Sequence, residues 1–279
     1  MITLGDVRVR ILQGGTFAVD GGAIFGVVPR TLWERSDPPD AANRVALALN
    51  VALVEAGGRR LLVDTGIGDK WSDKERGIYR IDPAVTLLGA LREAGLGPED
   101  VDVVVNTHLH FDHAGGNTRL VDGRPVPSFP RARYVVQMGE WEDATRPHER
   151  SRASYREADF VPLAESRQLE TIQGEVELAP GVRVRPVGGH TAYHQIVVIE
   201  GGGRRLVIPS DLIPTSSHLR LPYIAAFDLF PVGTLEAKRR LLAQAAEEAA
   251  LMLFYHDRRR PLGRIVRKGD RYDCIEVSE

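Results

Sequence analysis

The chain has 279 residues, of which 43% are hydrophobic and 27% charged, a composition typical of water-soluble globular proteins. The net charge of −2 argues against a nucleic-acid partner, because proteins that bind nucleic acids usually carry a basic excess. The single cysteine, Cys274, excludes a disulfide framework within the chain and a zinc site built from several thiolates. The N-terminus lacks the apolar core of a signal peptide and no apolar run could span a bilayer, so we expect a cytoplasmic protein with no membrane partner.

The first elements along the chain are predicted to be strands. Residues 2–12 alternate apolar and polar side chains, with a turn at Gly5-Asp6. Residues 16–44 are rich in glycine and proline, and we expect an irregular segment there. Two apolar runs, 45–54 and 61–63, are separated by two glycines and therefore predict a hairpin.

The middle of the chain changes from buried elements to a charged segment. Asp82-Pro83 predicts the start of a helix that ends at Gly95. The short β-branched run 101–105 predicts a buried strand, and residues 134–137 predict another. Residues 139–170 are highly charged without a clean period, so we expect a surface insertion that contains helical pieces.

The second half repeats the order of strands followed by a helix. We expect a helix from Thr234, as its N-cap, to about residue 249. A last hairpin is expected over 263–277. Two sheets packed face to face with helices outside would suit this order of elements, in one domain over residues 1–279. The remaining predicted strands are 182–187, 195–200, 205–209 and 251–255.

A cluster of metal-binding side chains follows the buried strand at 101–105. In an extended segment, side chains two residues apart point the same way, so His108, His110 and Asp112 converge on one side. A turn after Asp112 lets His113 join them. Imidazole and carboxylate are the usual ligands of zinc in proteins, so this loop is predicted to bind metal.

Three further candidates stand at the C-terminal ends of predicted strands. His190 lies in a turn beside two glycines, Asp211 follows the strand 205–209, and His256 follows the strand 251–255. Loop residues at strand ends can gather around a shared site, so we expect these three side chains to complete the metal centre. By contrast, His218 is expected in a surface loop.

From Asp64-Thr65-Gly66 through His256, these motifs resemble those of the metallo-β-lactamase-fold hydrolases. The resemblance implies an α+β protein, an αββα sandwich with two mixed sheets face to face, and two divalent metal ions, expected to be Zn²⁺. It implies that Asp211 bridges both metals and that Asp64, otherwise a plain turn residue, orients a ligand. It assigns one metal to His108, His110 and His190, and the other to Asp112, His113 and His256. It also implies that His194 packs near the site without binding metal.

Two such metals would activate a bridging hydroxide as the nucleophile at neutral pH. Asp112 is a candidate for moving a proton to the leaving group. The loop 107–117, together with segments 20–29 and 210–223, resembles quorum-quenching N-acyl-homoserine lactonases, especially the YtnP-type group, and also methyl parathion hydrolase. The resemblance implies a lactonase; the alternative is a broad aryl-ester or organophosphate hydrolase that uses the same metals.

The substrate side of the site is less constrained by sequence. The lactonases it resembles carry a tyrosine three residues after the bridging aspartate, where this chain has Pro214, so Tyr223 is a candidate replacement as a catalytic residue. Aromatic residues in irregular segments could form an apolar wall for the substrate or could fill gaps under long loops. We expect a small-molecule substrate and a possible homodimer. The candidates for the wall are Phe25, Trp33, Tyr223 and Phe227.

Overall fold

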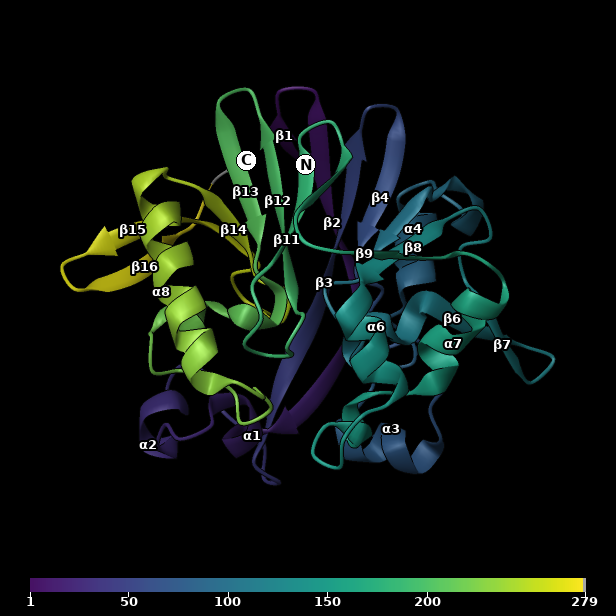
Figure 1. Cartoon of the computed structure of the whole chain (residues 1–279). Helices are drawn as coiled ribbons and strands as arrows, with labels where there is room; N and C mark the ends of the chain where they lie inside the picture. Colours follow the sequence, from purple (N-terminus) through teal and green to yellow (C-terminus); the bar gives the residue numbers. More distant parts are fainter. Residues whose placement is uncertain (278–279) are drawn as a thin grey trace.

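The computed structural model describes residues 1–277 and contains two large mixed sheets with helices on their outer sides (Figure 1). The predicted sandwich is therefore confirmed. In the first sheet the early strands pair antiparallel, whereas β4, β5, β8 and β9 pair parallel. Its strands in spatial order are β1 (Ile2–Leu4), β2 (Val7–Asp20), β3 (Arg44–Ala56), β4 (Arg59–Val63), β5 (Val103–Val105), β8 (Arg133–Gln137) and β9 (Leu169–Ile172).

The second sheet is built by the later part of the chain. All its neighbouring strands pair antiparallel except β13 and β14, which are parallel. A separate two-stranded ribbon joins β6 (Thr118–Val121) to β7 (Arg124–Pro127). The strands of the second sheet in spatial order are β10 (Val176–Ala179), β11 (Val182–Pro186), β12 (Gln195–Gly201), β13 (Arg204–Ile208), β14 (Leu251–Leu253), β15 (Leu262–Lys268) and β16 (Arg271–Ile275).

Helices cover the outer faces of both sheets, with α8 on one side and α4, α6 and α7 on the other (Figure 1). The α-helices are α1 (Gly21–Phe25), α2 (Arg30–Trp33), α3 (Asp73–Tyr79), α4 (Leu87–Glu93), α5 (Phe111–Ala114), α6 (Met138–Thr145), α7 (Glu157–Glu165) and α8 (Pro231–Glu247). Short 3₁₀ turns are η1 (Pro98–Asp100), η2 (Gly115–Asn117), η3 (Arg152–Ser154), η4 (Ser210–Leu212) and η5 (Ser216–Leu219). Within residues 1–277, none of the helices combines the length and apolar character that crossing a membrane requires.

Strand alternation explains why the core lies on both sides of each sheet. Along β12, Val197 and Ile199 face the other sheet, whereas Ile196 and Val198 pack with α8. Because successive strand residues point to opposite faces, a strand covered on both sides must be apolar throughout. All four of these side chains are buried, and the apolar layer between the sheets brings their strand ends close together.

Several boundaries differ from the sequence prediction. The segment 16–44 is only partly irregular, because β2 continues to Asp20 and two short helices follow it. The helix expected after Asp82 begins at Leu87, because the Thr86 hydroxyl caps it by accepting from the backbone N–H of Gly89. The Asp82 carboxylate instead accepts from the N–H of Ala84 and closes a local turn.

The last helix and the charged segment also differ from the expectation. Helix α8 begins at Pro231, so Thr234 lies within its first turns and is not the N-cap. The charged segment 139–170 contains α6 and α7, as predicted, but these helices also contribute to the core. Phe160 and Leu163 are fully buried, and so is the side chain of Glu140. Charged residues on the outer faces of these helices concealed the buried positions in the sequence.

Candidate metal centre

The structure brings all seven predicted metal ligands to one end of the sandwich. Strand β5 ends just before His108, and the short helix α5 carries Asp112 and His113. His110 is extended (φ −65°, ψ 153°) and stands at the N-cap of α5, so the chain turns sharply between the two pairs of ligands. The prediction that the segment stays extended through Asp112 and turns only after it is therefore wrong, because helix α5 already begins at Phe111 and places Asp112 beside His113 and not beside His108 and His110.

The remaining ligands come from loops after strands of the second sheet. His190 follows β11 in a loop where Gly188 and Gly189 both have positive φ, a backbone shape that favours glycine. Asp211 lies in η4 after β13, and His256 lies shortly after β14. The prediction that these residues stand beyond strand ends and meet the first cluster is confirmed.

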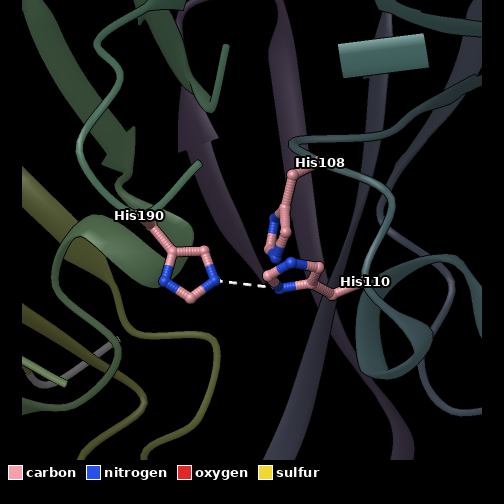
Figure 2. A group of neighbouring side chains, drawn as sticks. All are labelled: His108, His110 and His190. Carbon is pink, nitrogen blue, oxygen red and sulfur yellow. Dashed lines mark hydrogen bonds between the residues drawn. The ribbon is translucent and has the colours of Figure 1, made fainter. Parts of the chain in front are cut away.

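The seven side chains form two groups in which the candidate ligand atoms lie within 4.8 Å of one another. The first group comprises His108, His110 and His190, whose rings face a common centre (Figure 2). The second group comprises Asp112, His113, Asp211 and His256.

Asp211 lies between the two groups. One carboxylate oxygen, Oδ1, is 3.1 Å from Nε2 of both His113 and His256. The other, Oδ2, is 3.3 Å from Nε2 of His190 in the first group. Each oxygen therefore faces a different group, which is the arrangement that a bridging carboxylate needs.

The partners of the outer ring nitrogens determine which nitrogen of each histidine can bind metal. His190 Nδ1 is 2.8 Å from Asp228 Oδ1, and His113 Nδ1 is 2.9 Å from Asp64 Oδ2. His256 Nδ1 is 3.0 Å from the carbonyl oxygen of Ala48. Because these partners accept hydrogen bonds, each Nδ1 carries the proton and leaves the Nε2 lone pair directed at the centre.

Ring nitrogens directed at the centre lie close to one another, so each close pair shares either a proton or a cation. His190 Nε2 lies 3.0 Å from His110 Nδ1, and His256 Nε2 lies 3.3 Å from His113 Nε2. Two nitrogen lone pairs at such distances repel unless a positive charge lies between them. Nε2 of His108 is buried and has no hydrogen-bond partner among residues 1–277. A donor set of imidazoles and carboxylates fits zinc and similar divalent ions.

Burial and the carboxylates set the protonation of the histidines. Burial is the main cause that lowers the pKa of His108 well below its usual value and favours the neutral form that binds metal. Burial also acts against charge on His113, but Asp211, Asp112 and Asp64 raise its pKa well above the usual value. The carboxylates thus create a negative potential in the second group, and this potential favours a cation.

Asp64 connects the end of β4 to the metal loop. It lies in a tight turn with φ 59° and is fully buried. Its two oxygens accept from the N–H and the hydroxyl of Thr107, both at 2.8 Å, in addition to His113 Nδ1. Asp64 thus closes the turn and also contacts the predicted ligand His113, and its role in orienting a metal ligand stays a prediction.

Asp228 accepts a hydrogen bond from Nδ1 of His190, as Asp64 does from His113, and the sequence analysis missed it. The Thr234 hydroxyl donates to Asp228 Oδ2 at 2.6 Å, and the other oxygen receives His190 Nδ1. Asp228 precedes α8 in an irregular segment and shares no motif with the histidines, so local sequence carried no signal for it. His194 belongs to neither group, as expected, although its buried ring lies 5.2 Å from that of His108.

A pocket of about 50 Å³ opens onto both groups. A second cavity of about 260 Å³ adjoins it, because Leu47 and His256 line both spaces. Of the four predicted wall residues, Phe227 lines the pocket, and Pro214 lines it too. The rest of the apolar wall was not predicted, because half of it comes from strands β2 and β3 and part of it from the short helices α1 and α5. It consists of Phe17, Val19, Ile24, Leu47, Phe111 and Ala225.

Phe25, Trp33 and Tyr223 lie behind this wall and do not line the pocket. The rings of Phe25 and Trp33 stack with centroids 4.9 Å apart, and each residue is only 1% exposed. Tyr223 packs edge-on against Phe25, and its hydroxyl is 3.4 Å from an Arg220 guanidinium nitrogen. Helices α1 and α2 fold these aromatic rings onto one another, so they fill the core beneath the loops.

His218, expected in a surface loop, is fully buried beside these rings. Its Nδ1 is 2.8 Å from the Thr215 hydroxyl and its Nε2 is 3.0 Å from the carbonyl oxygen of Ile24. The carbonyl oxygen of Ile24 can only accept a hydrogen bond, so Nε2 of His218 carries the proton. Nδ1 then accepts from the Thr215 hydroxyl, and the ring is neutral. Burial, with Lys238 adding to it, lowers the pKa of His218 from 6.5 to about 4.

This shift predicts a loss of stability in acid. Between about pH 6.5 and pH 4 the unfolded chain binds a proton on His218 and the native chain does not, so this contribution to the free energy of unfolding decreases as the pH falls. The slope approaches about 1.4 kcal/mol per pH unit. Urea titrations from pH 7 to pH 4 should show this dependence, and a His218→Gln variant should show a shallower one. Equal slopes in the two proteins would remove His218 as the cause.

Comparison with known proteins places this geometry in a family. The model of the metallo-beta-lactamase superfamily matches residues 45–256. The N-acyl homoserine lactonase AiiA of Bacillus thuringiensis subsp. kurstaki is 28% identical over 219 residues, which cover 74% of this chain and 79% of that protein.

Solved structures agree in fold over the whole chain. A probable metal-dependent hydrolase from Staphylococcus aureus superposes with a TM-score of 0.90 at 30% identity, covering 100% of both chains. The dizinc quorum-quenching lactonase AidC, solved in complex with a product, superposes with a TM-score of 0.81 at 20% identity. That match covers 100% of this chain and 97% of AidC.

Proposed function

Because the chain belongs to the metallo-beta-lactamase superfamily and is a metal-dependent hydrolase, we propose that it is a dinuclear zinc lactonase that opens N-acyl-homoserine lactones. The single observation that carries the dinuclear proposal is Asp211, whose two oxygens face the two ligand groups separately. The relatives that are named N-acyl homoserine lactonases support the choice of substrate.

The chemistry divides between the metals and the side chains. When bound, two zinc ions would activate a water molecule as the nucleophile and polarise the carbonyl of the substrate. His108, His110 and His190 would hold one ion, and the second group would hold the other with Asp211 shared. Ring opening leaves an alkoxide that needs a proton. Asp112 lines the pocket and its side chain is 13% exposed, so it can carry a proton between the site and solvent.

The shape of the site suits a small polar reacting group with a larger apolar part. The pocket beside the ligand groups is small, at about 50 Å³, so the larger part of the substrate must extend outward. Phe227 is 40% exposed and lies where the pocket meets solvent. We propose that an acyl chain leaves the metal centre past Phe227 or through the adjoining cavity beyond Leu47.

A second candidate function is a broad aryl-ester or organophosphate hydrolase with the same metals. Two observations favour it. Position 214 is proline, so no phenol hydroxyl is present there to hold a lactone carbonyl, and Tyr223 lies behind the pocket wall. The wall also contains Phe17 and Phe111, against which an aryl group could pack.

Relative turnover of three substrates tests the choice. We expect zinc-loaded enzyme to give its highest kcat/KM with an N-acyl-homoserine lactone, a lower value with an aryl ester, and the lowest with an organophosphate. The control is the same protein after chelation, which should cleave none of them above background. A higher kcat/KM for the organophosphate or the aryl ester would replace the lactonase proposal with the second candidate. The identity of the metal, a homodimeric state and a cytoplasmic location all stay predictions.

A further inference from the structure

One carboxylate outside both metal groups contacts every loop that forms the first group. Glu140 lies in α6, and its side chain is fully buried. Its Oε1 accepts from the backbone N–H of Leu109 and from the hydroxyl of Tyr155, both at 3.0 Å. Its Oε2 accepts from the hydroxyl of Thr191 at 2.5 Å. No ion pair to a lysine or arginine is recorded for Glu140 in the part of the chain that the structure describes.

Each of the three donors lies next to a predicted ligand of the first group, either along the chain or by ring packing. Leu109 stands between His108 and His110 in the chain, so its N–H fixes the backbone that carries both rings. Thr191 directly follows His190. The Tyr155 ring packs on the His110 ring with centroids 4.8 Å apart, and the two residues also form an isolated β-bridge. Glu140 therefore joins the loop that carries His108 and His110 to the loop after β11 that carries His190, across the two halves of the chain.

We propose that Glu140 is a positioning residue that holds the three histidines of the first group in the geometry that binds metal, and that it ties this group to the wall of the substrate pocket. The inference rests on the dinuclear site of the proposed function. It assigns a role to a residue in the charged segment 139–170 that no metal motif includes.

The electrostatics explain why a carboxylate is used. A buried carboxylate is costly unless donors surround it, and burial raises the pKa of Glu140. The three hydrogen bonds and the nearby His190 act in the opposite direction and favour the ionised form. His190 is also a ligand of the first group, so a cation bound there would favour the charged form further. Metal and carboxylate would thus stabilise one another.

The link to the pocket runs through the segment that follows α6. Ser154 lines the pocket beside Tyr155. Arg150 donates to the carbonyl oxygen of Ala226 at 2.7 Å, next to the wall residue Ala225. Loosening Tyr155 would therefore disturb the pocket wall as well as His110, so loss of the Glu140 side chain should change KM in addition to metal affinity.

The test separates hydrogen bonding from charge and from general damage. Glu140→Ala removes all three acceptors, whereas Glu140→Gln keeps the shape and can still accept from Leu109 and Tyr155. Thr191→Val removes one bond with little change in size. The matched control is Glu142→Gln, which removes an exposed carboxylate from the same helix. Stepwise zinc affinities are measured on the full-length protein by chelator competition. Visible spectra of the cobalt-substituted protein assign each step to the three-histidine group or to the carboxylate-containing group.

We expect Glu140→Ala to weaken zinc binding at the first group by about 10–100-fold, alter its cobalt spectrum and raise KM, with the second group unchanged. Glu140→Gln should recover most of the affinity, Thr191→Val should show a smaller loss, and Glu142→Gln should match the wild type. If Glu140→Ala does not fold, the zinc affinities of Glu140→Gln and Thr191→Val decide whether the inference holds.

Three results would overturn the inference. The first is a wild-type zinc affinity at the first group in Glu140→Ala or Thr191→Val. The second is an equal loss of affinity in Glu140→Gln and Glu140→Ala, and the third is an equal loss at both groups. A wild-type protein that binds two cations without cleaving lactones would refute the proposed function but not the role of Glu140, because the metal titration needs no substrate. A wild-type protein that binds fewer than two cations would refute both.

Discussion

Replacing Asp211 with alanine is expected to reduce kcat/KM by roughly 1000-fold, because a metal site contributes several kcal/mol to the stabilisation of the transition state. The carboxylate faces both ligand groups, with 3.1 Å to His113 and His256 on one side and 3.3 Å to His190 on the other. Its removal deprives both cations of a shared anionic ligand, so we expect the purified variant to contain less than two equivalents of metal.

The fold of this variant should survive. Within residues 1–277 the side chain of Asp211 contacts the predicted ligand histidines and forms no hydrogen bond to a helix end or a strand. Circular dichroism of the metal-free proteins should therefore be the same for the variant and the wild type. Asp211→Asn is the matched control, because it keeps the shape and one oxygen but loses the charge. An alanine variant that keeps two metals and the wild-type kcat would show that Asp211 bridges nothing.

The second large effect is expected at Asp64, on stability and on the second metal together. Asp64→Ala leaves the buried N–H of Thr107 without an acceptor and removes the nearest acceptor of the Thr107 hydroxyl and of His113 Nδ1, which keep only the Ser210 hydroxyl at 2.9 and 3.4 Å. An unsatisfied buried donor costs about 1–3 kcal/mol, and alanine is also strained at φ 59°. We expect the free energy of unfolding of the metal-free protein to fall by about 3 kcal/mol or more.

Asp64→Asn provides the comparison for this prediction. Asparagine tolerates the left-handed backbone and keeps one oxygen as an acceptor, so its loss of stability should be smaller. It still removes the charge near His113, and zinc binding at the second group should weaken by about 10–100-fold. Urea denaturation with and without zinc measures both effects. An unchanged unfolding midpoint in Asp64→Ala would mean that the three donors find other partners.

The convergence of the seven candidate ligands could be predicted from sequence because the signals for it are local. Four metal-binding side chains within six residues after a buried strand allow few alternatives, and His190, Asp211 and His256 each follow an apolar run that predicts a strand. Strand ends that meet at one edge of a sandwich then bring them together. The structure confirms this convergence, including the position of Asp211 between the groups.

The residues that support the ligands could not be predicted, because their roles come from packing across the chain. Glu140 contacts Leu109 across 31 residues, and Asp228 contacts His190 across 38. Both lie in segments whose composition indicates a solvated surface or an irregular loop. The role of the aromatic residues stayed open for a related reason, because an aromatic side chain in a glycine-rich segment suits a pocket wall and a buried stack equally well. In the structure Phe25 and Trp33 form the buried stack.

Elemental analysis of the purified full-length protein, combined with a lactone assay before and after chelation, tests the central claim most directly. The account predicts two equivalents of a divalent metal per chain, loss of lactone hydrolysis when chelation removes them, and recovery when zinc is returned. Stoichiometric absence of metal, or undiminished hydrolysis by metal-free protein, would contradict it.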